Sequence, residues 1–236
     1  MSLTKKLTEV ISATGELFFP PICISCGTHL FKNEVEICQM CIRRLPRTHF
    51  ENRPHDNQIS IMMWGRCKIE LAFVLFFYRK GERVQYLLHE IKYRGNQLLG
   101  EELGRQLGVS IKKSDVCEFD FIVPIPLHPK KLAKRGYNQA EVIAKGISEI
   151  LKVPLDVDSV IRNIHTSSQT RKGRFERWQN VEEIFKMTDM ERLKNKHILL
   201  IDDVITTGST MEACINQLTT IEGLKVSVAS IACAAL

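Results

Sequence analysis

The chain has 236 residues. Because a domain averages roughly 150 residues, this length allows one large domain, or one domain with a small appendage. Hydrophobic residues make up 44% and charged residues 25%, which excludes a disordered or collagen-like chain, and the net charge of +6 is far below that of a histone-like protein.

The N-terminal residues carry a helical pattern rather than a secretion signal. Leu3, Leu7, Val10 and Ile11 are spaced for one face of a helix, and no secretory apolar region is present. The longest apolar run, residues 71–78, is strand-sized and much shorter than the roughly 18 residues of a membrane span. We therefore expect a cytoplasmic protein with no membrane insertion.

Two C-x-x-C pairs follow within residues 23–41. They are separated by 11 residues, and Gly27 comes directly after the first pair, where a tight metal-binding turn requires it. Four thiolates suit tetrahedral Zn²⁺, so the spacing predicts a structural zinc in a compact treble-clef or ribbon-like module. Disulfides or buried free thiols are the alternatives. The predicted ligands are Cys23, Cys26, Cys38 and Cys41.

A polar stretch at 43–58, interrupted by Pro46 and Pro54, is typical of a linker. We therefore place an N-terminal helix, the zinc-finger module and the linker in residues 1–55, and a larger domain in residues 56–236.

The larger domain alternates strand and helix patterns. Apolar runs rich in β-branched residues predict strands, and apolar residues at helical spacing predict the helices between them. This alternation indicates an α/β fold with a parallel-rich sheet covered on both faces. The expected strands are 69–78, 121–126, 197–202 and 225–232, and the expected helices lie around 87–91, 137–151 and 209–218.

The most informative segment is residues 198–210, ILLIDDVITTGST. Asp202 and Asp203 end an apolar strand, where open α/β sheets bind their ligands. A Thr/Gly/Ser loop then offers hydroxyls and backbone N–H groups at the start of a helix, which predicts an anion site. The loop residues are Thr206, Thr207, Gly208, Ser209 and Thr210.

No G-x-x-x-x-G-K-[ST] or G-x-G-x-x-G motif occurs, which argues against a nucleoside triphosphatase or a dinucleotide enzyme. Carboxylates beside a phosphate site suit a ligand with a diol next to its phosphate, such as ribose 5-phosphate. The alternative is an ordinary turn in which Asp203 and Ser209 satisfy backbone donors.

The segment resembles the signature of the type I phosphoribosyltransferases. This resemblance implies the twisted, parallel-rich sheet of that fold and phosphoribosyl pyrophosphate as the ligand. It makes Asp202 and Asp203 the ribose-hydroxyl ligands, and residues 206–210 the 5-phosphate loop. The two acids are also candidate catalytic residues, because they could stabilise positive charge that develops on the ribose.

Two basic segments are candidates for binding the pyrophosphate, which requires positive charge and usually Mg²⁺. The turn after the strand at 121–126 predicts a pyrophosphate loop. Residues 167–180 lack an apolar period and are interpreted as a flap that excludes water. Solvated surface charge is the alternative for each side chain. The candidates are Lys130, Lys131 and Arg135 in the turn, and Arg171 and Lys172, as catalytic residues, in the flap.

The four-cysteine finger, LLHEIKYRG, PIPLHPKKLAKRGYNQAE, QTRKGRFERWQN and IDDVITTGST together resemble the ComF family over nearly the whole chain. The resemblance implies a zinc-finger-bearing protein with a type I phosphoribosyltransferase-like domain. In some bacteria such proteins are associated with natural competence, the uptake of single-stranded DNA.

Two functions follow as hypotheses. The first is an enzyme that transfers the 5-phosphoribosyl group to an acceptor that the sequence does not identify, with release of pyrophosphate. The second is a non-catalytic protein that senses phosphoribosyl pyrophosphate and binds single-stranded DNA, with DNA-uptake proteins as partners. The basic residues after the finger motivate it, although at a net charge of +6 a solvated linker explains them better than a dedicated DNA groove: Arg43, Arg44, Arg47 and Arg53.

Overall fold

The computed structural model describes residues 20–115, 118–162 and 184–234, and the chain divides into two compact units, Met1–Leu45 and Pro46–Leu236. In the first unit, Cys23 and Cys26 lie on a tight turn in which the Gly27 N–H donates to the Cys23 carbonyl at 2.8 Å. Cys38 caps the short helix α2 (Gln39–Arg43), which carries Cys41. The two C-x-x-C pairs therefore occupy a turn and a helix start.

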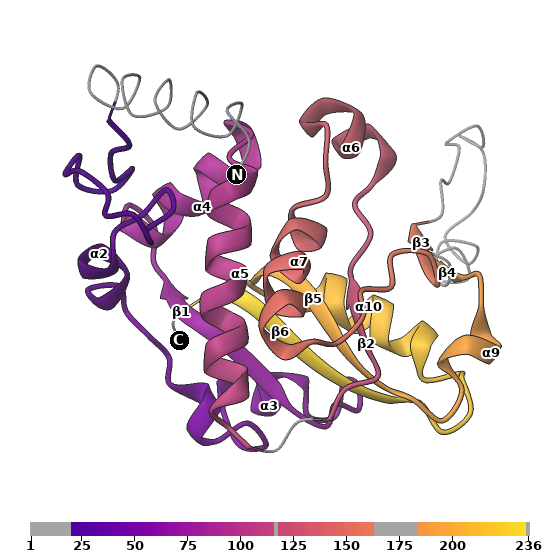
Figure 1. Cartoon of the computed structure of the whole chain (residues 1–236). Coiled ribbons are helices and arrows are strands. Elements are labelled where there is room, and N and C mark those ends of the chain that lie inside the picture. The colour runs from indigo at the N-terminus through magenta and orange to yellow at the C-terminus, as the bar shows by residue number, and fades with distance from the viewer. Residues whose placement is uncertain (1–19, 116–117, 163–183, 235–236) are drawn as a thin grey trace, which may run out of the picture. The chain divides into compact units, whose positions relative to one another are not determined.

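The second unit contains a four-stranded sheet in the order β1-β6-β5-β2, with every neighbouring pair parallel. This arrangement confirms the predicted parallel-rich sheet (Figure 1). An antiparallel pair of short strands forms a second, separate sheet. The strands are β1 (Ala72–Tyr78), β2 (Phe121–Pro124), β5 (His197–Ile205) and β6 (Lys225–Ala234), with β3 (Val160–Arg162) and β4 (Phe185–Met187) in the small sheet.

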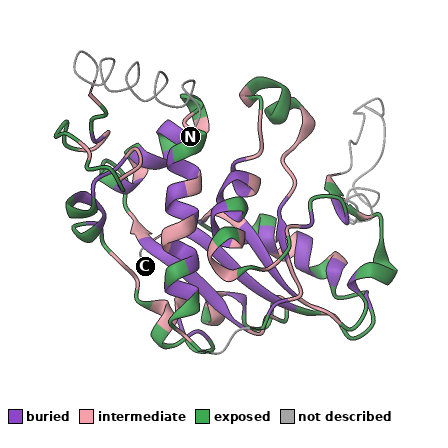
Figure 2. Ribbon diagram, in the orientation of Figure 1, coloured by how far each residue is buried: buried purple, intermediate pink, exposed green. Residues whose placement is uncertain are grey.

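Helices cover both faces of the main sheet, as its buried strands require. Side chains alternate along β5: Ile198 and Leu200 pack into a cluster with α3 and α10, so Leu199 and Ile201 face the opposite layer. Figure 2 shows buried residues concentrated in the sheet and in the helix sides toward it. The first layer contains α3 (Gln58–Met63) and α10 (Ser209–Leu218), and the second contains α4 (Arg83–Tyr93), α5 (Gln97–Lys112) and α7 (Gln139–Leu151).

Helices α5 and α7 pack with their backbones in contact. A Cβ at Gly104 would lie 2.2 Å from the Ile143 carbonyl oxygen, and one at Gly146 would lie 2.1 Å from that of Glu101. Only glycine permits this approach. The close packing fixes α7 against the sheet, with the N-terminus of α7 near the ends of β2 and β5.

The polar stretch predicted as a linker is ordered along β1 from Pro46 onward. The Phe77 N–H donates to the Pro46 carbonyl at 2.8 Å, and the Thr48 N–H donates to that of Leu75 at 3.2 Å. β1 is an edge strand, and its otherwise unpaired backbone groups explain the contact. A 3₁₀ turn (Phe50–Asn52) and α3 then follow.

The basic turn at 129–135 is a short helix, α6 (Pro129–Arg135), rather than a loop. Pro129 stands at its start, His128 accepts the Lys130 N–H, and Gly136 ends it in the left-handed conformation. One further short helix, α9 (Met190–Leu193), precedes β5. Among the described residues, no helix is long and apolar enough to cross a bilayer.

Candidate functional site

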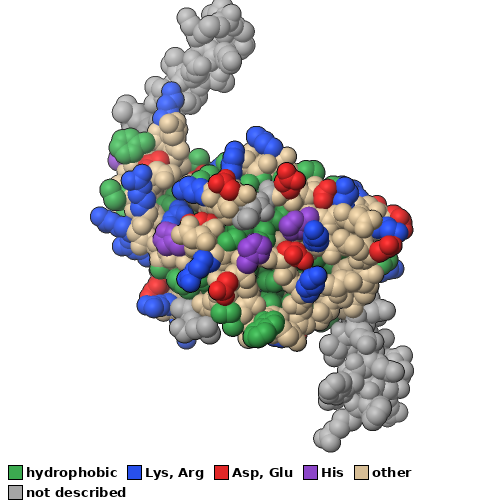
Figure 3. All heavy atoms as spheres, turned by 90° about the horizontal axis from the view of Figure 1, so that it is seen from below, with side chains coloured by type: hydrophobic (Ala, Val, Ile, Leu, Met, Phe, Trp, Pro, Cys, Tyr) green, Lys and Arg blue, Asp and Glu red, His purple; other side chains and the backbone are tan. Residues whose placement is uncertain are grey.

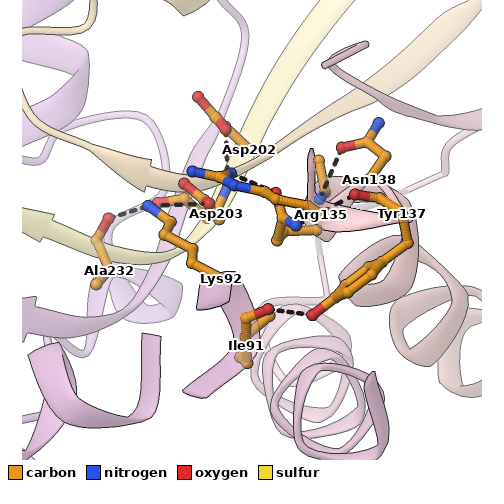
Figure 4. Close-up of polar contacts among 11 residues, drawn as sticks. Ile91, Lys92, Arg135, Tyr137, Asn138, Asp202, Asp203 and Ala232 are labelled. Atoms are coloured by element: carbon orange, nitrogen blue, oxygen red, sulfur yellow. Dashed lines mark hydrogen bonds and ion pairs between the residues drawn. The ribbon is translucent and has the colours of Figure 1, made fainter. Parts of the chain in front are cut away.

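The two acids lie near the carboxyl end of β5, where successive side chains point to opposite faces of the sheet. Asp203 turns toward α4, and its Oδ2 lies 3.0 Å from Nζ of Lys92 (Figure 4). Oδ1 of Asp202 accepts the backbone N–H of Asp203 at 2.8 Å. Each carboxylate therefore has one oxygen held by the protein and a second oxygen to offer a ligand.

The electrostatics of the pair are set by burial. Desolvation, and after it the charge of Asp203, raise the pKa of Asp202 to about 7; the Asp203 N–H and the charges of Lys92 and Arg162 oppose this rise. Burial also lowers the pKa of Arg162, at the end of β3. The pKa of Asp202 thus lies near neutrality, in a site that also holds Asp203 and the two cations Lys92 and Arg162.

Contacts with α3 and with Arg66 hold the loop after β5 in its conformation. Gly208 precedes α10 with φ +75°, and a Cβ there would lie 2.7 Å from Cε of Met63 in α3. Arg66 donates to the Thr207 carbonyl at 2.9 Å and pairs with Glu212. Support from α3 and Arg66 fixes the backbone at the start of α10, where the first N–H groups of a helix lack intrahelical partners and can bind an anion.

A cavity of about 460 Å³ opens beside the acids. It is lined by α4, the end of β2, α6, the start of α7, β3 and the end of β5. A small adjoining hollow of about 30 Å³ is formed by residues 202–211 and includes the Thr/Gly/Ser loop. The predicted site residues that line the large cavity are Lys131, Arg135, Asp202, Asp203, Thr206 and Thr210.

The remaining predicted residues fall into three groups. Thr207, Gly208 and Ser209 line the small hollow rather than the large cavity. Lys130 is exposed on α6 and lines neither of the two. Arg171 and Lys172 of the expected flap lie outside the described residues.

One wall of the cavity is aromatic and cationic. The guanidinium of Arg135 lies 5.3 Å from the ring centroid of Tyr93, and the ring of His89 lies 4.7 Å from that of Tyr93. Arg135 also donates to Oε1 of Gln139 at 2.6 Å. These two contacts hold the positive charge of Arg135 at the cavity.

Residues at the start of α7 join this wall to the sheet. The Tyr137 hydroxyl donates to the Ile91 carbonyl in the last turn of α4 (Figure 4). The side-chain amide of Asn138 donates to the Ile125 carbonyl after β2 at 3.0 Å. These two bonds fix α4, and with it Lys92, relative to the strand ends.

Sequence reasoning missed Lys92, Arg162 and Arg66. Lys92 lies in the helical segment LLHEIKYRG, near two buried apolar residues. This position is the one sequence signal that could have indicated its role in the site. Arg162 and Arg66 lie outside the two basic segments, so no local pattern marked them.

The four cysteine sulfurs lie within 4.8 Å of one another, and those of Cys26 and Cys38 are 3.8 Å apart. Zinc–sulfur bonds of about 2.3 Å in a tetrahedron place the sulfurs about 3.8 Å apart. The cluster therefore fits a four-thiolate zinc site that has no position left for a substrate.

A second cavity, of about 1090 Å³, lies at the amino ends of the strands. Its lining includes Asp120, Lys196, His197 and Lys225. Asp120 pairs with Lys196 at 2.9 Å. Figure 3, seen from that side, shows acidic and basic side chains interspersed. This end lacks the loop and the acid pair, and α/β sheets bind ligands at the carboxyl ends of their strands.

Comparison with known proteins agrees with this geometry. The family of the phosphoribosyl transferase domain matches residues 137–236. The *Escherichia coli* K12 "DNA utilization protein YhgH" is 27% identical over 217 residues, covering 83% of this chain and 89% of the relative. The *Bacillus subtilis* "Competence protein ComFC" is 26% identical over 194 residues, covering 80% and 74%.

The solved structure of *B. subtilis* glutamine phosphoribosylpyrophosphate amidotransferase aligns with 60% of this chain and 30% of its own, with a TM-score of 0.44 and 17% identity. The relatives match most of the chain, while the domain match covers α7, β5, the loop, α10 and β6. The chain is therefore similar to the competence and DNA-utilization proteins over most of its length, with a four-cysteine module before a phosphoribosyltransferase-type domain.

Proposed function

We propose that the chain binds phosphoribosyl pyrophosphate with Mg²⁺ in the cavity beside β5, and transfers its 5-phosphoribosyl group to an acceptor with release of pyrophosphate. The observation that carries this proposal is the acid pair beside the loop at the start of α10. Asp202 and Asp203 each offer a carboxylate oxygen, and the loop offers backbone N–H groups. A vicinal diol next to a phosphate matches both sets of groups.

In the proposed reaction, a lone pair of the acceptor attacks the anomeric carbon, and the bond from that carbon to the pyrophosphate oxygen breaks. The bonding electrons leave with pyrophosphate, and the proton of the acceptor passes to solvent or to a nearby base. Asp202 and Asp203 act as catalytic residues, because their charge stabilises the positive charge that develops on the ribose.

Lys131 and Arg135, which line the cavity from α6, supply positive charge for the pyrophosphate. We assign the same role to Arg171 and Lys172, and a peripheral one to Lys130. Mg²⁺ suits a cavity with carboxylate donors, and supplies charge neutralisation to the diphosphate when bound to its oxygens. We further propose that the four cysteines hold a structural Zn²⁺.

Replacement of both acids tests the site. The variant Asp202→Asn/Asp203→Asn should lose at least about 100-fold in affinity for phosphoribosyl pyrophosphate, because both charged acceptors for the diol are removed. Titration calorimetry measures the affinity, and a thermal melt checks the fold. Asp158→Asn, on an exposed residue outside the cavity, is the matched control. Undiminished affinity in the double variant would refute the site.

A second function is supported by the name of the E. coli relative, DNA utilization protein YhgH. We propose that single-stranded DNA binds to exposed arginines after the finger. Arg43, Arg44 and Arg53 are exposed, whereas the Arg47 guanidinium lies 5.8 Å from the ring centroid of Phe76. DNA-uptake proteins are the partners that this role implies.

Phosphate contacts release counterions, so this binding should weaken with salt. Reversing the charge of Arg43, Arg44 and Arg53 should weaken it and reduce its salt dependence, as measured by fluorescence anisotropy with a labelled oligonucleotide. Affinity that is equal at low and high salt would remove the case for this function.

A further inference from the structure

Lys92 stands out because it reaches the acid pair from a part of the chain outside the matched phosphoribosyl transferase domain. Its Nζ lies 3.0 Å from Oδ2 of Asp203, with side-chain exposures of 23% for the lysine and 14% for the aspartate. A pair this sheltered is screened less by solvent than a surface pair. The contact therefore restricts the carboxylate of Asp203.

We propose that Lys92 is a positioning residue that orients Asp203 for the 2-hydroxyl of the ribose diol, and that it thereby makes the site prefer ribose 5-phosphates over their 2-deoxy counterparts. The inference rests on the proposed function, which places the diol on the acid pair. It concerns how Lys92, which acts on the sugar only through Asp203, determines which sugar phosphate the site accepts.

The contacts of the acids give each one a fixed orientation. Oδ1 of Asp202 is tied to the Asp203 N–H, and Oδ2 of Asp203 is tied to Lys92. Each acid retains a second oxygen, which gives two acceptors for the two hydroxyls of a diol. Without Lys92, the Asp203 carboxylate would rotate freely, since its terminal torsion is broad.

Lys92 is itself held in place. It lies in the last turn of α4, where the Ile91 carbonyl accepts the Tyr137 hydroxyl and Arg135 covers the ring of Tyr93. Anchors on both sides of Lys92 fix the helix that carries it. The backbone of Lys92 is anchored, and its ammonium group is paired with Asp203. Lys92 can therefore position this acid with little further loss of side-chain entropy when a ligand binds.

A different role would be direct contact with the pyrophosphate after release of Asp203. The two roles differ in which ligands they affect. Positioning of Asp203 changes binding of a sugar phosphate that has both hydroxyls, whether or not pyrophosphate is attached. Direct contact changes binding of phosphoribosyl pyrophosphate alone.

The test compares ribose 5-phosphate with 2-deoxyribose 5-phosphate by titration calorimetry, using the full chain. We expect the unmodified protein to prefer ribose 5-phosphate by about tenfold, since one charge-assisted hydrogen bond is lost with the hydroxyl. Lys92→Met should weaken ribose 5-phosphate binding about five- to tenfold and change 2-deoxyribose 5-phosphate binding by less than about twofold. The preference would then nearly disappear.

Lys92→Arg should restore most of the preference, because it retains a cation that can reach Asp203. Lys145→Met is the matched control, since Lys145 lies on α7 outside the cavity with a long pair to Glu141 of 3.8 Å. A thermal melt checks folding, and Lys92→Gln replaces the Met variant if that variant is unfolded. If Lys92→Met acted only by lowering the overall positive charge, binding of both sugar phosphates would weaken equally, and the ratio of their affinities would not change.

Equal losses for both sugar phosphates, an unchanged ratio, or an effect seen only with phosphoribosyl pyrophosphate would each overturn the inference while the proposed function stands. If the unmodified protein bound both sugar phosphates equally, diol recognition by the acid pair would fail, and the proposed function with it.

Discussion

The two sides of the cavity are built differently. On the β5 side, the acids and the loop are consecutive residues at a strand end and a helix start, and much of their chemistry comes from backbone N–H groups. On the side formed by α4 and α6, Lys92 and Arg135 come from different helices and act through long side chains. The first side depends on exact backbone shape, and the second depends on how distant elements pack.

This difference predicts that the β5 side tolerates substitutions less well than the side formed by α4 and α6. A backbone site fails when its conformation changes, because every N–H group moves together. A side-chain wall loses one contact at a time. The predictions below test this contrast, from the largest expected effect to the smallest.

Gly208→Val should abolish binding of phosphoribosyl pyrophosphate and destabilise the fold by about 3 kcal/mol, because a side chain at φ +75° would also collide with Met63. Gly65→Val is the matched control: Gly65 has the same φ of +75° with nothing within 4 Å of its Cβ position. Calorimetry and urea unfolding measure both variants. Equal effects of the two substitutions would show that contact with α3 does not shape the loop.

Asp202→Asn should stabilise the unliganded protein by about 1 to 2 kcal/mol at pH 8 while weakening ligand binding. Burial raises the pKa of Asp202 to about 7, so the folded state binds more protons than the unfolded state between about pH 4 and pH 7, and this residue's contribution to stability falls as pH rises. The gain in the variant should therefore grow from pH 4 to pH 7 and then level off.

Asp203→Asn provides the contrast. It leaves Lys92 without its carboxylate partner, so its free energy of unfolding should fall rather than rise at pH 8. Urea unfolding at several pH values measures both variants. A gain for Asp202→Asn that did not vary with pH would contradict the role of burial.

Arg135→Gln should have the smallest effect. It removes one cation from the wall and the contact with Tyr93, so affinity for phosphoribosyl pyrophosphate should fall about threefold to tenfold, with stability changed by less than about 1 kcal/mol. Lys134→Gln, exposed on the same helix and outside the cavity, is the control. If Arg135→Gln reduced the affinity as much as Gly208→Val does, the two sides of the cavity would not differ in their tolerance of substitution.

The same contrast explains what could be predicted from the sequence. The acids, the loop and the strand before them form one contiguous pattern, so residues 198–210 predict both their fold and their chemistry. The pattern of alternating strands and helices likewise predicted the sheet, because burial on both faces imposes continuous apolar runs.

Lys92 and Arg162 could not be found in this way. Lys92 reaches Asp203 because α4 is held by Tyr137, and Arg162 approaches Asp202 because β3 ends beside the cavity. Neither fact is encoded near the residue itself. The sequence predicts a turn after the strand at 121–126, whereas the structure has a helix at 129–135, because Pro129 occupies the first helical position, which proline also favours.

The most direct measurement is a crystal structure of the protein with phosphoribosyl pyrophosphate and Mg²⁺. We predict the ribose hydroxyls on Asp202 and Asp203, and the 5-phosphate on the N–H groups of the loop before α10. A sugar phosphate bound elsewhere, with protein side chains filling the space beside the acids, would contradict the account.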